Sequence, residues 1–162
     1  MAFYDLILVK GDTMFELANV KRLGLLERHA PAMLEKFSAL LRAQEFIQGH
    51  YPARFEALKV AKLDDYNYEA TYLNTTVRFQ LMFSYNEHSR PLARVMCLHK
   101  YTVADKVHYE SLGTFAFDSD GLTDLEENPE YGPRYMERCA DEIVVAYLDL
   151  AVARYPKKFS QE

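Results

Sequence analysis

The sequence predicts an α+β fold, in which an antiparallel β-meander of three to four strands packs with two N-terminal helices and one long C-terminal helix. Two observations predict this class. Residues 73–117 alternate between apolar and polar side chains with the period of two that strands have. Before and after them, apolar residues recur at helical spacing, which is typical of helices that cover a core. Because short turns separate the alternating segments, their strands are expected to be antiparallel neighbours.

Length and composition indicate one domain over residues 1–162. The chain is 49% hydrophobic and 27% charged, as globular proteins are, and no linker or repeat divides it. Its formal net charge of −5 argues against binding to nucleic-acid backbones. The apolar start of the chain contains Asp5 and no basic residue precedes it, so neither a signal peptide nor a membrane span is expected. Cys97 and Cys139 are expected as buried free thiols, which places the chain in the cytoplasm.

Two helices are expected in the first third of the chain. Residues 3–9 form a short apolar run that fits a strand or a helix equally well. Thr13 and Glu16 then have the spacing of a capping box, and apolar residues follow at loosely helical spacing. Pro31 suits the first turn of a second helix, which Gly49 is expected to end. The buried stripe of this second helix comprises Met33, Leu34, Phe37, Leu40, Leu41 and Ile47.

Three strands are expected in the middle of the chain, joined by two turns. The strand sequences are LNTTVRFQLMFSY, LARVMCLHKYTV and VHYESLGTFAF, and the turns are NEHSRP and ADK. The earlier segment RFEALKVAKL is interpreted as another strand, although its spacing also allows a helix. An acidic loop follows the last strand. A long helix is then expected from Arg134 to Arg154, with Pro156 as its stop.

Hairpin geometry predicts which strand residues share a face, because directly paired residues do. If the first hairpin pivots near His88, its pairs are Leu81–Val95, Phe79–Cys97 and Val77–His99. If the second pivots near Ala104, its pairs are Tyr101–Val107, His99–Tyr109 and Cys97–Ser111. The predicted core face then collects Val77, Phe79, Leu81, Phe83, Val95, Cys97, Val107, Tyr109, Phe115 and Phe117. The small residues Ser111 and Gly113 would let a helix approach this face closely.

The opposite face of the sheet is expected to carry an apolar centre within a charged rim. The centre comprises Met82, Met96, Leu98 and Leu112, and the rim comprises Arg78, Arg94, Lys100, His108 and Glu110. Interfaces between proteins are commonly built in this way, with Met and Arg enriched. Two alternatives stay open. The N-terminal helices could cover this face and make a three-layer domain, or a one-residue slip in register could exchange the two faces.

The sequence carries no recognisable catalytic or cofactor-binding motif, so no cofactor is expected and an enzyme is the less favoured class. Cys97 and His99 share a strand face, but a zinc site needs further ligands, and His108 is expected on the other face. The acidic loop DSDGLTDLEE resembles a calcium loop only superficially, because Gly121 follows Asp118 too early for an EF-hand. No metal is therefore expected.

These observations favour a non-enzymatic interaction protein, such as an adaptor, a subunit, an immunity protein or a phage-type inhibitor. The residues of this chain that are predicted to contact the partner protein are Arg78, Met82, Arg94, Met96, Leu98, Lys100, His108 and Leu112. A second surface is the tyrosine-rich segment DDYNYEATYLN, expected at a sheet edge. The alternative function is a small enzyme or small-ligand binder with a pocket near His99, Tyr101 and Tyr109. A homodimer also stays open.

Overall fold

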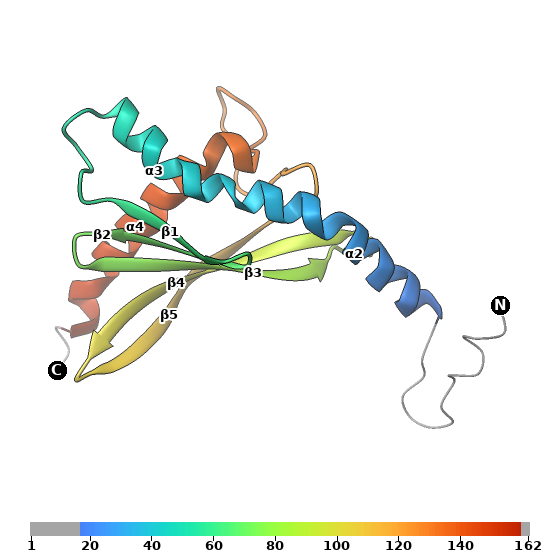
Figure 1. Ribbon diagram of the computed structural model, residues 1–162, viewed down its shortest axis with the longest axis horizontal. Coiled ribbons are helices and arrows are strands. Elements are labelled where there is room, and N and C mark those ends of the chain that lie inside the picture. Colours follow the sequence, from blue (N-terminus) through green and yellow to red (C-terminus); the bar gives the residue numbers. More distant parts are fainter. Residues whose placement is uncertain (1–16, 160–162) are drawn as a thin grey trace.

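The computed structural model describes residues 17–159 of the chain (Figure 1). The apolar run at residues 3–9 and the capping box at Thr13 and Glu16 lie outside the described residues. The elements are α2 (Leu17–Phe37), α3 (Ala39–His50), β1 (Lys59–Asp64), β2 (Asn67–Tyr72), β3 (Thr75–Tyr85), β4 (Pro91–Val103), β5 (Lys106–Phe117) and α4 (Met136–Phe159). The α+β class and the antiparallel meander are confirmed.

The strands form one antiparallel sheet in the order β1-β2-β3-β4-β5, so each strand pairs with its neighbour in the sequence. The sheet has five strands, and the expected three to four is too few. Strand β1 overlaps the segment RFEALKVAKL, which is interpreted above as a strand, whereas β2 was not expected. In β1 only Val60 is buried, so its sequence alternates too weakly to mark it clearly as a strand.

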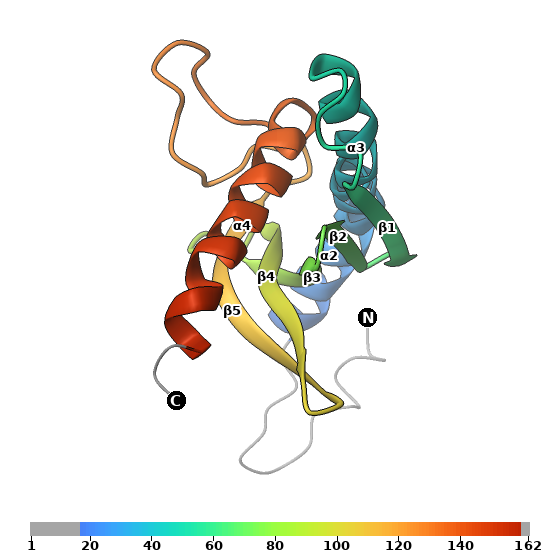
Figure 2. The same ribbon diagram turned by 90° about the vertical axis from the view of Figure 1, so that its left-hand side faces the viewer.

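The helices α2, α3 and α4 of the described residues lie on one face of the sheet (Figure 2). In β3 the residues Val77, Phe79 and Leu81 are buried, while those between them are not. On that buried face, Phe37 at the end of α2 packs edge-on against Tyr68 of β2, with 4.9 Å between the ring centroids. Met33 and Ile47 belong to the same core cluster as Ile143 of α4. The described part of the chain therefore has two layers, and the three-layer alternative is wrong.

The boundary between the N-terminal helices lies at Ser38, later in the sequence than expected. Pro31 does not open a second helix but lies inside α2. Its neighbours Ala30 and Ala32 favour helix, which offsets part of the cost of an interior proline. At Ser38 the backbone N–H donates to the carbonyls of both Leu34 and Glu35, and α3 begins at the next residue. At the other end of the chain, α4 continues past Pro156 to Phe159.

The first predicted hairpin has the expected register. Val77 pairs with His99, Phe79 with Cys97 and Leu81 with Val95. In the turn, the side-chain oxygen of Asn86 accepts hydrogen bonds from the backbone N–H groups of His88 and Arg90. An Asn that satisfies the backbone in this way is typical of turns.

The second hairpin is shifted by one residue from its expected register. Ala104 and Asp105 both have positive φ, 49° and 66°, and form a two-residue turn that pairs Tyr101 with His108 instead of Val107. The pairing shifts again between Leu98 and Cys97, where β5 has a bulge at Leu112, and Cys97 then pairs with Gly113. The bulge restores the expected faces from Gly113 onward, so that Phe115 and Phe117 lie on the core face.

This shift corrects two of the predicted contact residues. His108 shares the helix-covered face with Tyr101, since the two are directly paired. Leu112 is buried in the core cluster, next to Ile143 and Tyr147. In exchange, Val107 and Tyr109 move to the face that the helices leave open. Gly113 remains on the core face, where a Cβ atom in its place would stand 3.7 Å from the Tyr147 hydroxyl.

The core contains a hydrogen-bonded thiol at its centre. The Cys97 thiol is fully buried beneath α4, and the side chain of the partly buried Tyr147 hydrogen-bonds to it. Burial raises the pKa of the Cys97 thiol to about 12, and burial likewise raises the pKa of Tyr147. Cys139 is also buried, and its pKa is raised to about 11 for the same reason. Both thiols are therefore poor nucleophiles at neutral pH.

The raised pKa of Cys97 predicts a loss of stability at high pH. Above pH 9 the thiol of the unfolded chain ionises while that of the folded chain does not until about pH 12, so the stability it contributes is lost across this window. Between pH 9 and 11 the free energy of unfolding should fall by about 2 kcal/mol more in the wild type than in Cys97→Ser. Urea unfolding at both pH values measures this, and equal losses in the two proteins would contradict it.

Candidate functional site

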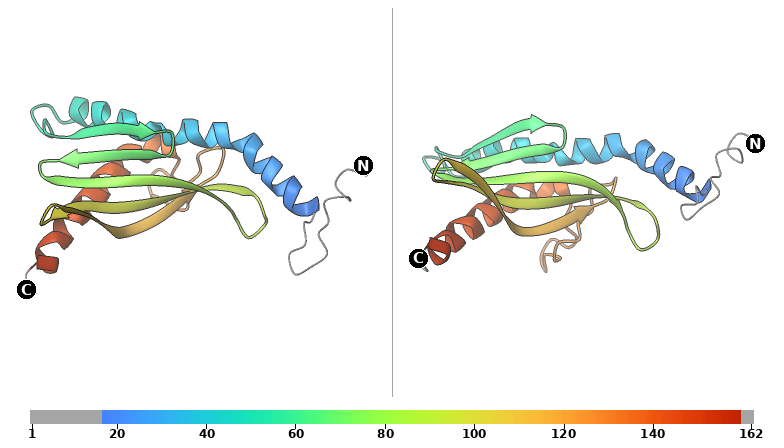
Figure 3. Two further views of the ribbon diagram at one scale, coloured as in Figure 1. Left: turned by 60° about the horizontal axis from the view of Figure 1, so that its bottom comes forward. Right: turned by 90° about the horizontal axis from the view of Figure 1, so that it is seen from below.

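The sheet face opposite the helices, termed here the outer face, carries most of the predicted contact residues. Seen from below, the strands lie in front of the helices (Figure 3, right). Arg78 pairs with Leu98, Met82 with Arg94 and Thr76 with Lys100, and all of these alternate with buried core residues. All the predicted residues except His108 and Leu112 therefore lie on the outer face.

The outer face has an apolar centre with aromatic and aliphatic side chains. Met82 is 53% exposed, and Met96 and Leu98 are half-buried beside it. Tyr109, which pairs with Lys100, adds an exposed ring that the expected register had assigned to the core. Met, Tyr and Arg are the residues that interfaces enrich. The composition of the face is therefore closer to an interface than to an ordinary wet sheet surface.

A buried carboxylate orders the charged side chains of the outer face. Glu69 of β2 is only 9% exposed. It accepts hydrogen bonds from Lys100 Nζ, at 3.0 Å, and from Arg78 Nη2, at 3.4 Å. The Arg78 guanidinium also lies over the Tyr109 ring, 5.0 Å from its centroid. These contacts connect β2 to β5 and hold long side chains in one arrangement before any partner binds.

Glu69 was missed by the sequence reasoning, although a signal was present. It alternates with Tyr68 and Ala70, both of which are buried in the core. Once β2 is recognised as a strand, this alternation places Glu69 on the face opposite Tyr68 and Ala70, where the register pairs it with Arg78.

The outer face is more basic than the chain as a whole. Among the strand residues that share this face, the cations are Lys59, Arg78, Arg94 and Lys100, and the anions are Asp64 and Glu69. Asp64 is already hydrogen-bonded to the Asn67 side chain and the Tyr66 N–H, which lower its pKa. The strand residues of this face thus have an excess of positive charge in a chain of net charge −5.

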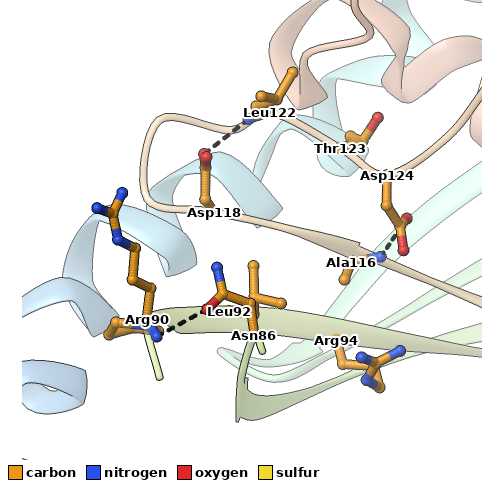
Figure 4. Close-up of a pocket in the computed structure, with 10 residues that line it drawn as sticks. Asn86, Arg90, Leu92, Arg94, Ala116, Asp118, Leu122, Thr123 and Asp124 are labelled. Atoms are coloured by element: carbon orange, nitrogen blue, oxygen red, sulfur yellow. Dashed lines mark hydrogen bonds between the residues drawn. The ribbon is translucent and has the colours of Figure 1, made fainter. Parts of the chain in front are cut away.

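A pocket of about 250 Å³ opens at one corner of the outer face, where the β3–β4 hairpin meets the loop after β5 (Figure 4). It is termed here the corner pocket. Its apolar lining comprises Pro91, Leu92, Ala116 and Leu122, and its polar lining comprises Asn86, Arg90, Arg94, Asp118, Thr123 and Asp124. Arg90 and Arg94 stand on opposite sides of it in this view. Because Arg94 pairs with both Met82 and Ala116, the pocket is continuous with the outer face.

The two aspartates of the corner pocket hold its backbone in place. Asp118 Oδ1 accepts hydrogen bonds from the N–H groups of Asp120 and Leu122, and Asp124 Oδ1 accepts one from Ala116 N–H, at 2.8 Å. Asp118 thus serves as a turn-forming residue of the acidic loop. Within the part of the chain that the structure describes, no group of three or more His, Cys, Asp or Glu side chains could hold a metal ion.

A second pocket, of about 450 Å³, lies on the helix side of the sheet near His99. Its lining includes Thr75, His99, Tyr101 and Val152. The His99 and Tyr101 rings are 5.3 Å apart, and His108 stacks on Tyr101 at 5.4 Å. This is the location expected for the alternative function. Tyr109, the third residue expected there, points to the outer face instead.

The tyrosine-rich segment does not present its rings together. Tyr68 is buried, and Tyr72 packs on Phe55 with 5.8 Å between the ring centroids. Tyr66 is exposed, and its ring meets that of Phe83 edge-on at 6.0 Å. The three rings therefore do not form one aromatic contact surface.

Both edges of the sheet are partly closed to an added strand. At the β1 edge the Val60 N–H donates to Gln44 Oε1, at 2.7 Å. At the β5 edge Arg154 donates to the Ser111 carbonyl, and Phe117 forms a bridge to Thr123. Edge strands protected in this way do not readily pair with another chain. The outer face is thus the better candidate for contact with a partner.

Comparisons of the chain with protein-family models, with curated proteins and with solved structures found no match. None of the described helices is both long enough and apolar enough to cross a membrane.

Proposed function

We propose that this chain is a non-enzymatic protein that binds another protein through the outer face of its sheet. The observation that carries the proposal is the outer face itself. The described helices leave it open, yet it bears Met82, Met96 and Tyr109 beside charges that a buried Glu69 holds in place. Antiparallel sheets tolerate one wet face, but that face is then mainly polar. An adaptor, a subunit, an immunity protein or an inhibitor would each use such a surface.

The size of the outer face suits a specific interface. Two strands of 6 residues and three of 11 to 13 residues, spaced ~4.8 Å apart, offer a face of roughly 750 Å². A standard interface buries about 800 Å² on each partner.

The charge of the outer face favours an acidic partner over a second copy of the chain. Interfaces bring opposite charges together, and like charges placed face to face cost free energy. If two copies packed through this face, Arg78, Arg94 and Lys100 of one copy would face the positively charged rim of the other. A partner surface with Asp or Glu around an apolar patch meets no such penalty.

Capture from the native lysate tests this proposal, with nuclease added. The tagged wild type should retain a protein that Met82→Glu does not, because the substitution introduces a charge of the wrong sign at an exposed apolar position. The matched control is Phe46→Glu, which alters a residue of similar exposure, 57%, on α3 at the other side of the molecule. Equal capture by wild type and Met82→Glu would contradict the proposal, as would loss only in Phe46→Glu.

A small-ligand binder is the second candidate. The observation in its favour is the pocket near His99, whose volume of about 450 Å³ lies within the usual range of ligand sites. His99 is 4% exposed at its wall, and Tyr101 is beside it. If neither Met82→Glu nor Phe46→Glu changes what is captured, this pocket becomes the favoured site.

A further inference from the structure

We propose that the corner pocket binds a carboxylate side chain, Asp or Glu, of the partner protein. The inference rests on the proposed function and assigns the pocket as the point where the partner's acidic group is anchored. It concerns Arg90 and Arg94, the apolar residues Leu92 and Ala116 between them, and the loop from Asp118 to Asp124.

The hydrogen bonding of the pocket favours an acceptor as its guest. Asp118 and Asp124 already accept backbone N–H groups through Oδ1. Among residues 17–159, the guanidinium groups of Arg90 and Arg94 form no hydrogen bond or ion pair. The pocket therefore offers spare donors, and a guanidinium binds a carboxylate through two parallel hydrogen bonds.

The size of the pocket favours a side chain over a metabolite. Its volume of about 250 Å³ lies below the 300–1,000 Å³ usual for small-molecule and cofactor sites. Leu92 and Ala116 would contact the methylene groups of the guest. Asp118 and Asp124 balance the charge of the two arginines, so a singly charged carboxylate is tolerated better than a doubly charged phosphate.

The pocket is rigid enough to be formed before binding. The N–H and the hydroxyl of Thr123 both donate to the Arg134 carbonyl, the latter at 2.7 Å. Asn86 closes the hairpin on the opposite side through its bonds to His88 and Arg90. A preformed pocket next to an exposed apolar face is where interfaces concentrate their binding energy.

Titration with a small probe tests the pocket without the partner. The probe is N-acetyl-glutamic acid α-amide, its neutral match is N-acetyl-glutamine amide, and the readout is backbone amide NMR of the full chain. The acid should shift the amide signals of Leu92, Ala116 and Leu122 in saturable fashion at millimolar concentration. The glutamine probe should bind the wild type at least tenfold more weakly than the acid does. The acid should also bind the variant Arg94→Gln at least tenfold more weakly than it binds the wild type. Equal binding of both probes, shifts unchanged in Arg94→Gln, or no shifts at all would overturn the proposal.

Capture separates failure of the pocket from failure of the proposed function. The double variant Arg90→Gln/Arg94→Gln should retain at least tenfold less partner than the wild type. Arg138→Gln, which alters an exposed arginine on α4, should retain as much as the wild type. If the double variant retains full capture while Met82→Glu loses it, the pocket proposal is wrong and the outer face stands. If Met82→Glu also retains full capture, the proposed function is wrong as well.

Discussion

Met96→Glu is expected to lower the affinity for the partner at least 100-fold while the chain still folds. Met96 lies at the centre of the outer face, between Gln80 on β3 and Thr114 on β5. A carboxylate at this position would be desolvated beneath the partner and would repel the partner's acidic groups, which together cost several kcal/mol. In the free protein the side chain is only half-buried, so we expect its replacement to cost about 1 kcal/mol of stability.

Isothermal titration with the captured partner measures the affinity of this variant, and urea unfolding measures its stability. Met96→Leu is the matched control, because it keeps the volume and apolar character and should bind within about threefold of the wild type. If Met96→Glu prevents folding, the outer face is part of a core and the assignment of the two faces is wrong.

Phe79→Ala is expected to lower the free energy of unfolding by about 3–5 kcal/mol. Phe79 is fully buried on β3 and its ring meets that of Tyr147 of α4 edge-on, with 6.0 Å between centroids. It also pairs directly with Tyr68 and with Cys97. Truncation would leave a cavity beneath α4 that packed aromatic neighbours cannot easily fill.

Urea unfolding also measures this loss, with Phe46→Ala as the control. Phe46 is exposed on α3, so its truncation should change stability by no more than about 0.5 kcal/mol. A loss below about 1.5 kcal/mol for Phe79→Ala would contradict the described core. Phe79 and Met96 belong to adjacent strands of one sheet. Phe79→Ala should therefore mainly lower stability and Met96→Glu should mainly lower affinity, and this difference tests the assignment of the two faces.

The first hairpin could be predicted from the sequence because two independent signals agree there. Val77, Phe79 and Leu81 alternate with polar residues, and an Asn-containing turn follows at the right distance. Shifting this hairpin by one residue would expose its entire apolar set, so the pattern determines the register.

The second hairpin could not be predicted in the same way. Ala104 and Asp105 adopt positive φ without a glycine, so their sequence does not mark a two-residue turn of this kind. The bulge at Leu112 then inserts one residue into β5, and alternation alone does not reveal where. The two-residue turn moves His108 and Tyr109 to the faces opposite to those expected, and the bulge places Leu112 in the core.

Some contacts of the outer face could likewise not be predicted from the sequence. Glu69 and the Tyr109 ring become neighbours of Arg78 only through pairing of β2 and β5 on either side of the central strands. The corner pocket combines the hairpin at Arg90 with the loop at Asp124, two segments far apart in the chain. Such long-range neighbours require the three-dimensional structure.

Methionine methyl NMR of the chain, with the captured partner added, tests the central claim most directly. Met82 and Met96 lie on the outer face, whereas Met33 and Met136 are fully buried among the helices and serve as internal controls. We expect the methyl signals of Met82 and Met96 to shift or broaden on binding while those of Met33 and Met136 stay unchanged. Unchanged Met82 and Met96 signals in a formed complex would show that the partner binds elsewhere, and the outer face would not be the functional surface.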